Sequence, residues 1–372
     1  MNRKKICFVA QFPPPMHGLS KAVETLYYSQ LNSDINSNAG FKFEKINLSN
    51  NRKLIYNVIS IMRSQADLFY FTISQTRGGN IRDLIILKIL SLRNKKCVIH
   101  LHGGYYRKMV DSLNKWQKRA NYHAISELEG AIVLGPALKP IFQGMLPDSK
   151  IYTIPNCVDD EYLMSKEQFD QKQGRLKHSS VHHVLYLSNF IRSKGYPEVL
   201  EIAKLEKERV ESGGQQMFHF DFAGKFFEED EEKYFKEYIK KNCLDDFITY
   251  HGIVGGDKKR ELLELCAFFV LLTTYPKEGQ PISILEAMGN GMCIVTTNHA
   301  GIPDVVTDNI NGIVTNCEEI IPDKIYSRMM ASTKDITRYS CENREIIIKK
   351  YTQNQYINSI AACWIKILED LD

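Results

Sequence analysis

Residues 275–306 read YPKEGQPISILEAMGNGMCIVTTNHAGIPDVV, and this stretch carries the most specific pattern in the chain. A strand-like apolar segment ends just before it, Glu278 and Gly279 form a turn, and Pro281 stands where a helix would begin. Proline suits the first helical position because its missing N–H costs no hydrogen bond there. A helix start favours an anion. The backbone N–H groups expected to surround this one are those of Gly279, Gln280, Ile282 and Ser283.

Two carboxylates flank that helix start, since Glu278 precedes it and Glu286 lies inside the helix. A carboxylate that accepts from both hydroxyls of a ribose makes charge-assisted hydrogen bonds of about 1.5–3 kcal/mol each. An anion site at the helix start, with a diol-binding carboxylate beyond it, describes a nucleotide diphosphate. The spacing alone would fit two solvated surface glutamates. The order of strand, turn, proline and helix favours the nucleotide.

The chain around this stretch alternates strand-like and helix-like segments. Its 372 residues are 44% hydrophobic and 25% charged with a net charge of +4, which excludes a disordered or collagen-like protein and does not indicate nucleic-acid binding. Strands separated by helices imply βαβ units and parallel sheets. Because residues 166–182 are polar without apolar periodicity, we predict a linker there, between α/β domains at 1–165 and 183–350. Residues 351–372 are predicted to hold an amphipathic C-terminal helix.

Short apolar runs and helical periodicity locate the individual elements. The predicted strands are 5–11, 67–73, 96–102, 130–134, 151–154, 183–188, 218–223, 247–251, 268–273 and 293–297. The predicted helices are 18–31, with Ser20 as a cap, 81–92, 111–127, 196–211, 229–241, 257–267, 281–290 and 321–330.

Cysteine usage and hydropathy indicate the compartment. The nine cysteines are far apart and form no C-x-x-C pair, which argues against a disulfide framework or a zinc site and fits reduced thiols. The apolar run at residues 6–10 is too short for a signal peptide, and the other apolar runs are too short for a membrane span. We therefore expect a cytoplasmic protein.

The stretch that begins at Glu278 resembles the E-x7-E signature of GT-B glycosyltransferases, most closely retaining glycosyltransferase family 4 (glycosyl transferases group 1). The matching residues are Glu278-Gly279-Gln280-Pro281, Leu285-Glu286-Ala287-Met288, Gly291, Ala300-Gly301-Ile302-Pro303 and Asn311-Gly312-Ile313-Val314. The resemblance is clearest over residues 151–315. It implies two Rossmann-like domains that face each other across a cleft, and a C-terminal helix that crosses back to the N-terminal domain.

The resemblance also assigns donor-binding residues elsewhere. Lys194 matches a family lysine, whereas Ser188-Asn189 stands where the family has Gly-Arg. Arg192 is a candidate replacement, because an arginine can bind a phosphate with its fork, although a solvated loop is the alternative. In the first domain, Gly18 matches a glycine near the donor phosphate and His102 matches the cleft histidine that contacts the transferred sugar. Gly224, Gly252 and Ile253 match positions that line the nucleobase pocket in this family.

His100 and His102 share one face of a predicted strand, because residues two apart point the same way. Such a pair can ligate a metal ion. No third ligand is near in the sequence, and the resembled family uses no essential metal, so we predict no metal site. A hydrogen-bonded structural histidine is the alternative for either residue.

The resemblance implies a hexosyltransferase type of reaction, metal-independent and with retention. The donor is a nucleotide diphosphate sugar, with a UDP-sugar favoured, and no cofactor is expected. Backbone N–H groups at the helix start, with Lys194, would stabilise negative charge on the leaving diphosphate. Glu278 would orient the sugar hydroxyls, Glu286 would hold the ribose and His102 would contact the sugar.

The expected acceptor is a saccharide or lipid-linked saccharide of bacterial surface polysaccharide synthesis. A basic rim for a lipid diphosphate is one interpretation of five residues and a solvated surface is the other: Lys53, Arg77, Arg82, Arg107 and Lys108. Peripheral association with the inner face of the cell membrane is therefore left open, and no nucleic-acid partner is expected.

Two other functions are left open by the sequence. One is a nucleotide-sugar epimerase on the same fold, and the other is a non-catalytic scaffold that binds nucleotide sugars. The missing Gly-Arg pair at Ser188-Asn189 is what supports the scaffold. An NAD-dependent dehydrogenase is disfavoured, because no G-x-G-x-x-G follows the first strand.

Overall fold

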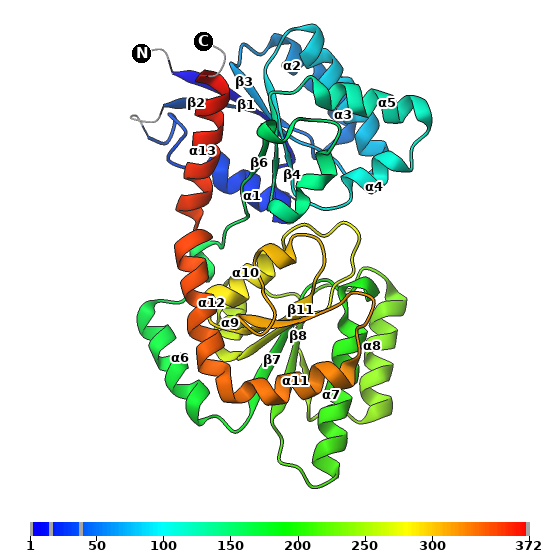
Figure 1. Ribbon diagram of the computed structural model, residues 1–372, viewed down its shortest axis with the longest axis vertical. Helices are drawn as coiled ribbons and strands as arrows, with labels where there is room; N and C mark the ends of the chain where they lie inside the picture. Colours follow the sequence, from blue (N-terminus) through cyan, green and yellow to red (C-terminus); the bar gives the residue numbers. More distant parts are fainter. Residues whose placement is uncertain (1–2, 15–17, 37–39, 370–372) are drawn as a thin grey trace. The chain divides into compact units, whose positions relative to one another are not determined.

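The computed structural model describes residues 3–14, 18–36 and 40–369. The chain divides into two compact units (Figure 1). Unit 1 consists of Met1–Cys157, Pro276–Gln280 and Gln353–Asp372, and unit 2 consists of Val158–Tyr275 and Pro281–Thr352. Among the helices of the described residues, none has the length and hydropathy that crossing a membrane requires.

Unit 1 is built on a parallel sheet of six strands in the order β2-β1-β3-β4-β5-β6. The strands are β1 (Lys4–Ala10), β2 (Phe41–Asn47), β3 (Leu68–Thr72), β4 (Cys97–Leu101), β5 (Gly130–Val133) and β6 (Ile151–Thr153). Every residue of β3, β4 and β5 is buried, as expected for parallel strands covered on both faces. Edge strand β2 alternates between buried and exposed residues.

Helices cover this sheet, and the last helix of the chain is one of them. They are α1 (Gly18–Tyr27), α2 (Leu54–Arg63), α3 (Arg77–Leu92), α4 (Tyr106–Asp111), α5 (Lys115–Ser126) and α13 (Gln353–Glu369), with 3-10 turns at Asn51–Lys53, Pro136–Phe142 and Asp148–Lys150. Trp364 of α13 is buried, with its ring centroid 5.8 Å from that of Phe8 and 5.6 Å from that of Tyr70. The C-terminal helix therefore packs on the N-terminal sheet, which confirms that part of the predicted fold.

Unit 2 has a second parallel sheet of six strands, in the order β12-β11-β10-β7-β8-β9. Its strands are β7 (His182–Leu187), β8 (Phe218–Ala223), β9 (Ile248–Tyr250), β10 (Phe268–Leu271), β11 (Cys293–Thr297) and β12 (Gly312–Thr315). The strand order reverses between β7 and β10. In open α/β sheets, ligands bind beyond the carboxyl ends of the strands at such a reversal.

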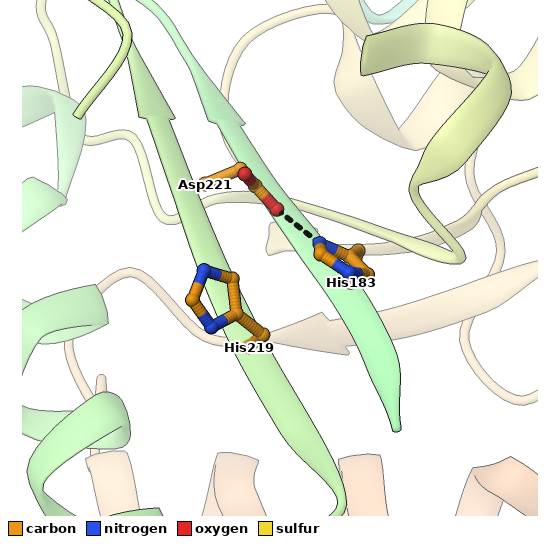
Figure 2. A group of neighbouring side chains, drawn as sticks. All are labelled: His183, His219 and Asp221. Carbon is orange, nitrogen blue, oxygen red and sulfur yellow. Dashed lines mark hydrogen bonds and ion pairs between the residues drawn. The ribbon is translucent and has the colours of Figure 1, made fainter. Parts of the chain in front are cut away.

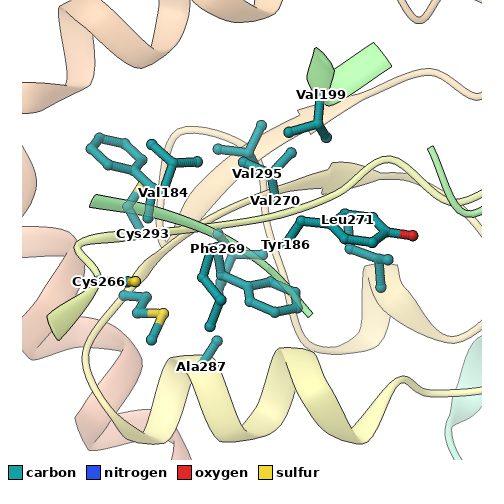
Figure 3. Packing of buried hydrophobic residues seen from close by; sticks show 14 of the residues in the cluster. Val184, Tyr186, Val199, Cys266, Phe269, Val270, Leu271, Ala287, Cys293 and Val295 are labelled. Atoms are coloured by element: carbon teal, nitrogen blue, oxygen red, sulfur yellow. The ribbon is translucent and has the colours of Figure 1, made fainter. Parts of the chain in front are cut away.

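The helices of unit 2 enclose a core around its central strands. They are α6 (Lys166–His178), α7 (Tyr196–Glu211), α8 (Glu229–Asn242), α9 (Gly256–Leu265), α10 (Ile282–Gly289), α11 (Pro322–Ser332) and α12 (Ile336–Lys350), with 3-10 turns at Asp160–Tyr162, Arg192–Lys194, Ile302–Asp304 and Thr333–Asp335. Figure 3 shows Phe269, Val270 and Val295 between Val199 of α7 and Ala287 of α10. Both sheet faces are thus covered, and the two units confirm the predicted α/β fold class.

The predicted linker over 166–182 is instead largely helix α6, within unit 2. Ser165 and Gln168 form a capping box at its start. Lys172 is buried and its Nζ donates to the carbonyls of Leu263, at 2.9 Å, and Asn290, at 2.8 Å. The segment lacks an apolar run because a lysine faces the interior, and this is why the apolar pattern failed to indicate a helix.

Some smaller predictions also differ from the structure. Besides α6, five elements were not predicted: β2, α2, α4, β12 and α12. Ser20 lies inside α1 and does not cap it, because the helix already includes Gly18. Three residues of the loop before that helix, 15–17, lie outside the described residues.

Candidate functional site

The carboxyl edge of the sheet in unit 2 is shaped first by Gly195, which separates a 3-10 turn from α7. Its φ of 83° is left-handed, and a Cβ there would lie 2.4 Å from the carbonyl oxygen of Leu272. The turn therefore approaches the chain beyond β10 as closely as only glycine permits. Ser193 completes the contact, because its carbonyl accepts from the N–H of Thr274 at 2.7 Å.

The side chains of Lys194 and Arg192, both predicted to bind phosphate, contact different elements of unit 2. Lys194 lies beside the segment after β10, with its Nζ 4.8 Å from the ring centroid of Tyr275. Arg192 is 55% exposed and turns to α8, where its Nε donates to Glu231 at 2.8 Å and its guanidinium lies 4.4 Å from the ring centroid of Tyr234. The structure thus commits Arg192 to α8, and its role as a replacement phosphate ligand stays a prediction.

Gly224 and Gly252 meet at the ends of neighbouring strands. The N–H of Gly224 donates to the carbonyl of Gly252 at 2.8 Å. Gly224 has a φ of 154°, and a Cβ there would lie 1.9 Å from the carbonyl oxygen of Ser188. A larger residue cannot be placed at 224 without moving the end of β7. Ile253 follows with 74% of its surface exposed, so this edge is open.

A buried carboxylate below this edge binds two histidines. Asp221 of β8 accepts from His183 Nδ1 and from His251 Nε2, each at 2.7 Å (Figure 2 shows the first bond). Burial would raise the pKa of Asp221, but these hydrogen bonds bring it below its usual value. Because His251 directly precedes Gly252, the carboxylate fixes the chain that leads to the open edge. This network was not predicted, since its members are far apart in the sequence.

The same cluster contains a candidate metal trio. His183, His219 and Asp221 offer ligand atoms that all lie within 4.8 Å of one another (Figure 2). Histidine and carboxylate ligands suit zinc. Each of the three side chains already has a hydrogen-bond partner, however, because His219 Nε2 lies 2.9 Å from Thr249 Oγ1. The arrangement is thus a complete hydrogen-bond network.

The helix start predicted at Pro281 is displaced by one residue. Helix α10 begins at Ile282, and Pro281 is its N-cap residue, with a φ of −63° and a ψ of 118°. The carbonyl of Pro281 accepts from the N–H groups of Ile284 and Leu285, at 3.2 and 3.4 Å. The N–H groups of Ile282 and Ser283 precede these first intrahelical bonds, as an anion site at a helix start requires.

Glu286 lies inside α10 and is only 4% exposed. Its Oε1 is 2.7 Å from Nζ of Lys259 in α9, and that ammonium lies 3.8 Å from the ring centroid of Tyr162. A charge this buried needs such a partner, since desolvation of an unpaired carboxylate is costly. The lysine was not predicted, because it stands in an ordinary charged run of residues, 257–261.

The segment before α10 belongs to unit 1, where Gln280 has a structural role. Its Oε1 accepts from the N–H of Asn156 at 2.8 Å and its Nε2 donates to the carbonyl of Leu134 at 3.3 Å. Asn156 returns a bond of 2.9 Å to the carbonyl of Gln280. The Gln280 side chain is therefore engaged in anchoring the segment, and the predicted contact of its backbone N–H with the donor stays a prediction.

Two glycines let this segment pack against the end of β4. A Cβ on Gly279 would lie 2.5 Å from the carbonyl oxygen of His102, and a Cβ on Gly103 would lie 2.7 Å from the carbonyl oxygen of Lys277. Glu278, between the two contact points, is buried. Of the residues predicted to be catalytic, His102 and Glu278 thus come together within unit 1, while Lys194 lies in unit 2.

His100 of β4 and His102, which follows this strand, share a face, as predicted. Their ring centroids are 3.9 Å apart. His100 is buried, and its Nδ1 lies 2.6 Å from the hydroxyl of Tyr70. Burial is the larger cause, and the neighbouring His102 the smaller one, that holds the pKa of His100 well below its usual value. This ring is therefore neutral. His100 has the structural role that was left open for it, whereas His102 is half-buried beyond the end of the strand.

The remaining predicted residues of unit 1 are less informative. Gly18 is exposed as the first residue of α1. Three members of the predicted basic rim have local partners. Arg82 pairs with Asp83 at 2.8 Å, Arg107 Nη1 donates to the hydroxyl of Tyr122 at 2.6 Å, and Arg77 Nη2 donates to Ser112 Oγ at 3.3 Å. The rim is therefore partly committed to intramolecular contacts.

Comparison with known proteins finds a family model and two relatives that are similar to this chain. Residues 167–326 match the family model Glycosyl transferases group 1. An uncharacterized 41.2 kDa protein in the cps region of Klebsiella pneumoniae is 21% identical over 352 residues, which cover 84% of this chain and 92% of the relative. The amylovoran biosynthesis glycosyltransferase AmsK of Erwinia amylovora is 26% identical over 150 residues, 39% of this chain and 35% of the relative.

A solved structure shows the same fold over the whole chain. The crystal structure of Anabaena HepE in complex with UDP has a TM-score of 0.75 at 16% identity, with 97% of this chain and all of that chain covered. At this identity the likeness establishes the fold. Residues 167–326 are therefore similar to a glycosyl transferases group 1 domain, and the chain has the GT-B fold of two α/β units.

Proposed function

We propose that this protein transfers a sugar from a nucleotide diphosphate sugar to a hydroxyl acceptor, with retention and without a metal ion. The observation that carries the proposal is the start of α10. The N–H groups of Ile282 and Ser283 precede the first intrahelical bonds, and the buried carboxylate of Glu286 follows within the same helix. A helix start favours a phosphate and a charged carboxylate accepts strong hydrogen bonds, so the two features together suit a diphosphate and the ribose next to it.

The buried ion pair makes Glu286 a suitable ribose ligand. Lys259 stabilises the charged carboxylate, which can only then accept hydrogen bonds from both hydroxyls of a diol. The edge formed by Gly224, Gly252 and Ile253 is the proposed contact for the base. A UDP-sugar is the favoured donor, and the complexes of Anabaena HepE with UDP and with UDP-glucose support this choice.

The proposed catalysis is electrostatic. Negative charge develops on the diphosphate as the glycosidic bond breaks, and the fixed N–H groups of Ile282 and Ser283, with the ammonium of Lys194, would stabilise it. Glu278 would orient the sugar hydroxyls and His102 would contact the sugar. The proposed reaction is a hexosyl transfer that uses no cofactor.

The acceptor is proposed to be a saccharide or lipid-linked saccharide of bacterial surface polysaccharide synthesis. The relatives from the cps region and from amylovoran biosynthesis support this setting. A cytoplasmic protein that associates peripherally with the inner face of the cell membrane fits such an acceptor.

The donor assignment can be tested by thermal shift and calorimetry with UDP-, GDP- and ADP-sugars. We expect one class to stabilise the wild type, and Glu286→Gln to weaken that binding by at least about tenfold, because the neutral amide loses a charge-assisted bond. Glu261→Gln on the exposed surface of α9 is the matched control. Wild-type-like donor binding by Glu286→Gln would contradict the assignment.

Product analysis then tests the reaction itself. A transferase releases nucleotide diphosphate only when an acceptor is present. Isomerised donor would identify an epimerase, and donor binding without turnover, in the presence of saccharide and lipid-linked acceptors, would identify a scaffold. Either result would overturn the proposed activity while leaving the donor site intact.

A further inference from the structure

Helix α2 of unit 1 exposes most of its apolar side chains. Ile55 is 78% exposed and Tyr56 is 69% exposed, and Ile59 and Met62 continue the same stripe at helical spacing. Only Asn57 and Ile61 of this helix are buried. The helix therefore packs on unit 1 by its minor apolar stripe and turns the larger one outward.

An apolar groove is lined by residues of α3 and α5. Helix α3 packs against both α2 and α5 (Figure 1). The volume of the groove is about 580 Å³, and Ile81, Leu84, Ile85, Trp116 and Ala120 contribute to its walls. Trp116 is 75% exposed at the start of α5. A tryptophan in this state, beside exposed isoleucines, is typical of a surface that meets an interface between water and lipid.

Positive charge surrounds these apolar side chains. Residues 51–63, 77–96 and 115–126 together contain twelve lysines and arginines and one acidic residue, although the whole chain has a net charge of only +4. That acidic residue, Asp83, is buried and paired with Arg82. Glu127 is the acidic residue among those that line the groove, and its carboxylate accepts from Ser91 Oγ at 2.9 Å.

We propose that this surface docks on an anionic lipid bilayer. The α2–α3–α5 surface is defined by eight exposed apolar residues together with the cations around them: Ile55, Tyr56, Ile59, Met62, Ile81, Ile85, Leu92 and Trp116. Its apolar side chains enter the boundary between headgroups and acyl chains, and its cations meet lipid phosphates. A second copy of the chain is disfavoured as the occupant, because two surfaces of the same positive sign repel each other.

The docking property is shared by three helices. None of them is both basic and apolar enough to bind a membrane alone, and for this reason the sequence left the question open. The cations exposed at the ends and on the faces of the helices are Arg52, Lys53, Arg63, Arg77, Lys88, Arg93, Lys115 and Arg119. Each lysine or arginine held near an anionic leaflet strengthens binding by about fivefold. The inference rests on unit 1 alone and needs none of the donor-site assignments.

Vesicle flotation with the full chain tests this inference. We expect binding to vesicles of phosphatidylcholine mixed with phosphatidylglycerol, weak binding to phosphatidylcholine alone, and a loss of binding as salt rises. Trp116→Ala combined with Ile55→Ser should weaken binding by about tenfold or more. Lys88→Glu combined with Lys115→Glu should weaken it by about 25-fold or more.

Matched variants on α12 of unit 2 serve as controls. Ile348→Ser and Lys350→Glu replace exposed residues of the same kinds and should bind vesicles like the wild type. All variants should retain the melting temperature of the wild type, because the replaced side chains are exposed.

Equal binding of surface and control variants, or no preference for anionic vesicles, would overturn the inference. Dimers that the surface variants dissociate, in a protein that does not float with vesicles, would identify a second copy as the occupant. Donor binding is measured without lipid, so a failure of the donor-site proposal can be told apart from a failure of the membrane-docking proposal.

Discussion

The start of α10 and the edge formed by β7, β8 and β9 are both parts of the proposed donor site, and they are built differently. The first is almost one continuous segment, in which Glu278, Pro281 and Glu286 follow one another along the chain. The second joins Ser188, Gly224 and Gly252 from three strands. The first is local and its geometry could be predicted, whereas the second exists only after the sheet has formed.

The local region nevertheless depends on a distant partner, and this gives the largest expected effect. Lys259→Met would leave Glu286 buried without its ammonium, which should lower the free energy of unfolding by about 3–5 kcal/mol. Urea denaturation measures the loss. Adding Glu286→Leu to this variant should restore much of the stability without restoring activity, because the pair is replaced by apolar packing. If Lys259→Met is as stable as the wild type, α10 does not depend on α9 for its charge balance.

The edge built from three strands should be most sensitive at Gly224. Gly224→Ala places a Cβ against the carbonyl oxygen of Ser188 in a backbone conformation that alanine avoids, so we expect a loss of about 2–3 kcal/mol. Gly40→Ala is the matched control, since a Cβ at that exposed position outside the helices meets no atom within 4 Å. Thermal unfolding of the two variants side by side measures the difference. Equal melting temperatures would show that the ends of β7 and β8 can separate freely.

What could be predicted from the sequence follows the same division. The fold class, the helix start and the pair Glu278 and Glu286 depend on short-range order, which a sequence displays directly. The contacts that those residues make with distant partners do not depend on short-range order and are not displayed in this way. Lys259 looks like any surface lysine, and Asp221 looks like an ordinary strand residue until His183 and His251 approach it from neighbouring strands. Edge strand β2 was missed although its residues alternate as an exposed strand does. Helix α6 was missed because Lys172 takes a core position.

Asp221 offers a smaller test of the edge. Asp221→Asn keeps the shape of the side chain but removes the charge that two histidines bind, so we expect a loss of about 2 kcal/mol in stability. Because the pKa of Asp221 is lowered in the folded state, its contribution is present above the unfolded value near 3.8 and is lost as the pH falls through the folded value. Acid titration of the wild type and the variant should therefore converge at low pH. Curves that stay parallel would show that the charge of Asp221 does not stabilise the fold.

The smallest expected effect on stability concerns Lys172, which contacts the carboxyl end of α10 through the carbonyl of Asn290. Burial lowers the pKa of this lysine to about 7, and the neutral amine still has two N–H groups for the carbonyls of Leu263 and Asn290. The unfolded chain, with a lysine pKa near 10.5, binds more protons than the folded chain above pH 7. Stability should thus rise with pH, by about 1 kcal/mol between pH 7 and pH 8. Urea denaturation across this range should show the rise in the wild type and in Lys177→Met, an exposed control on the same helix, and not in Lys172→Met. A rise that persists in Lys172→Met would assign the proton to another group.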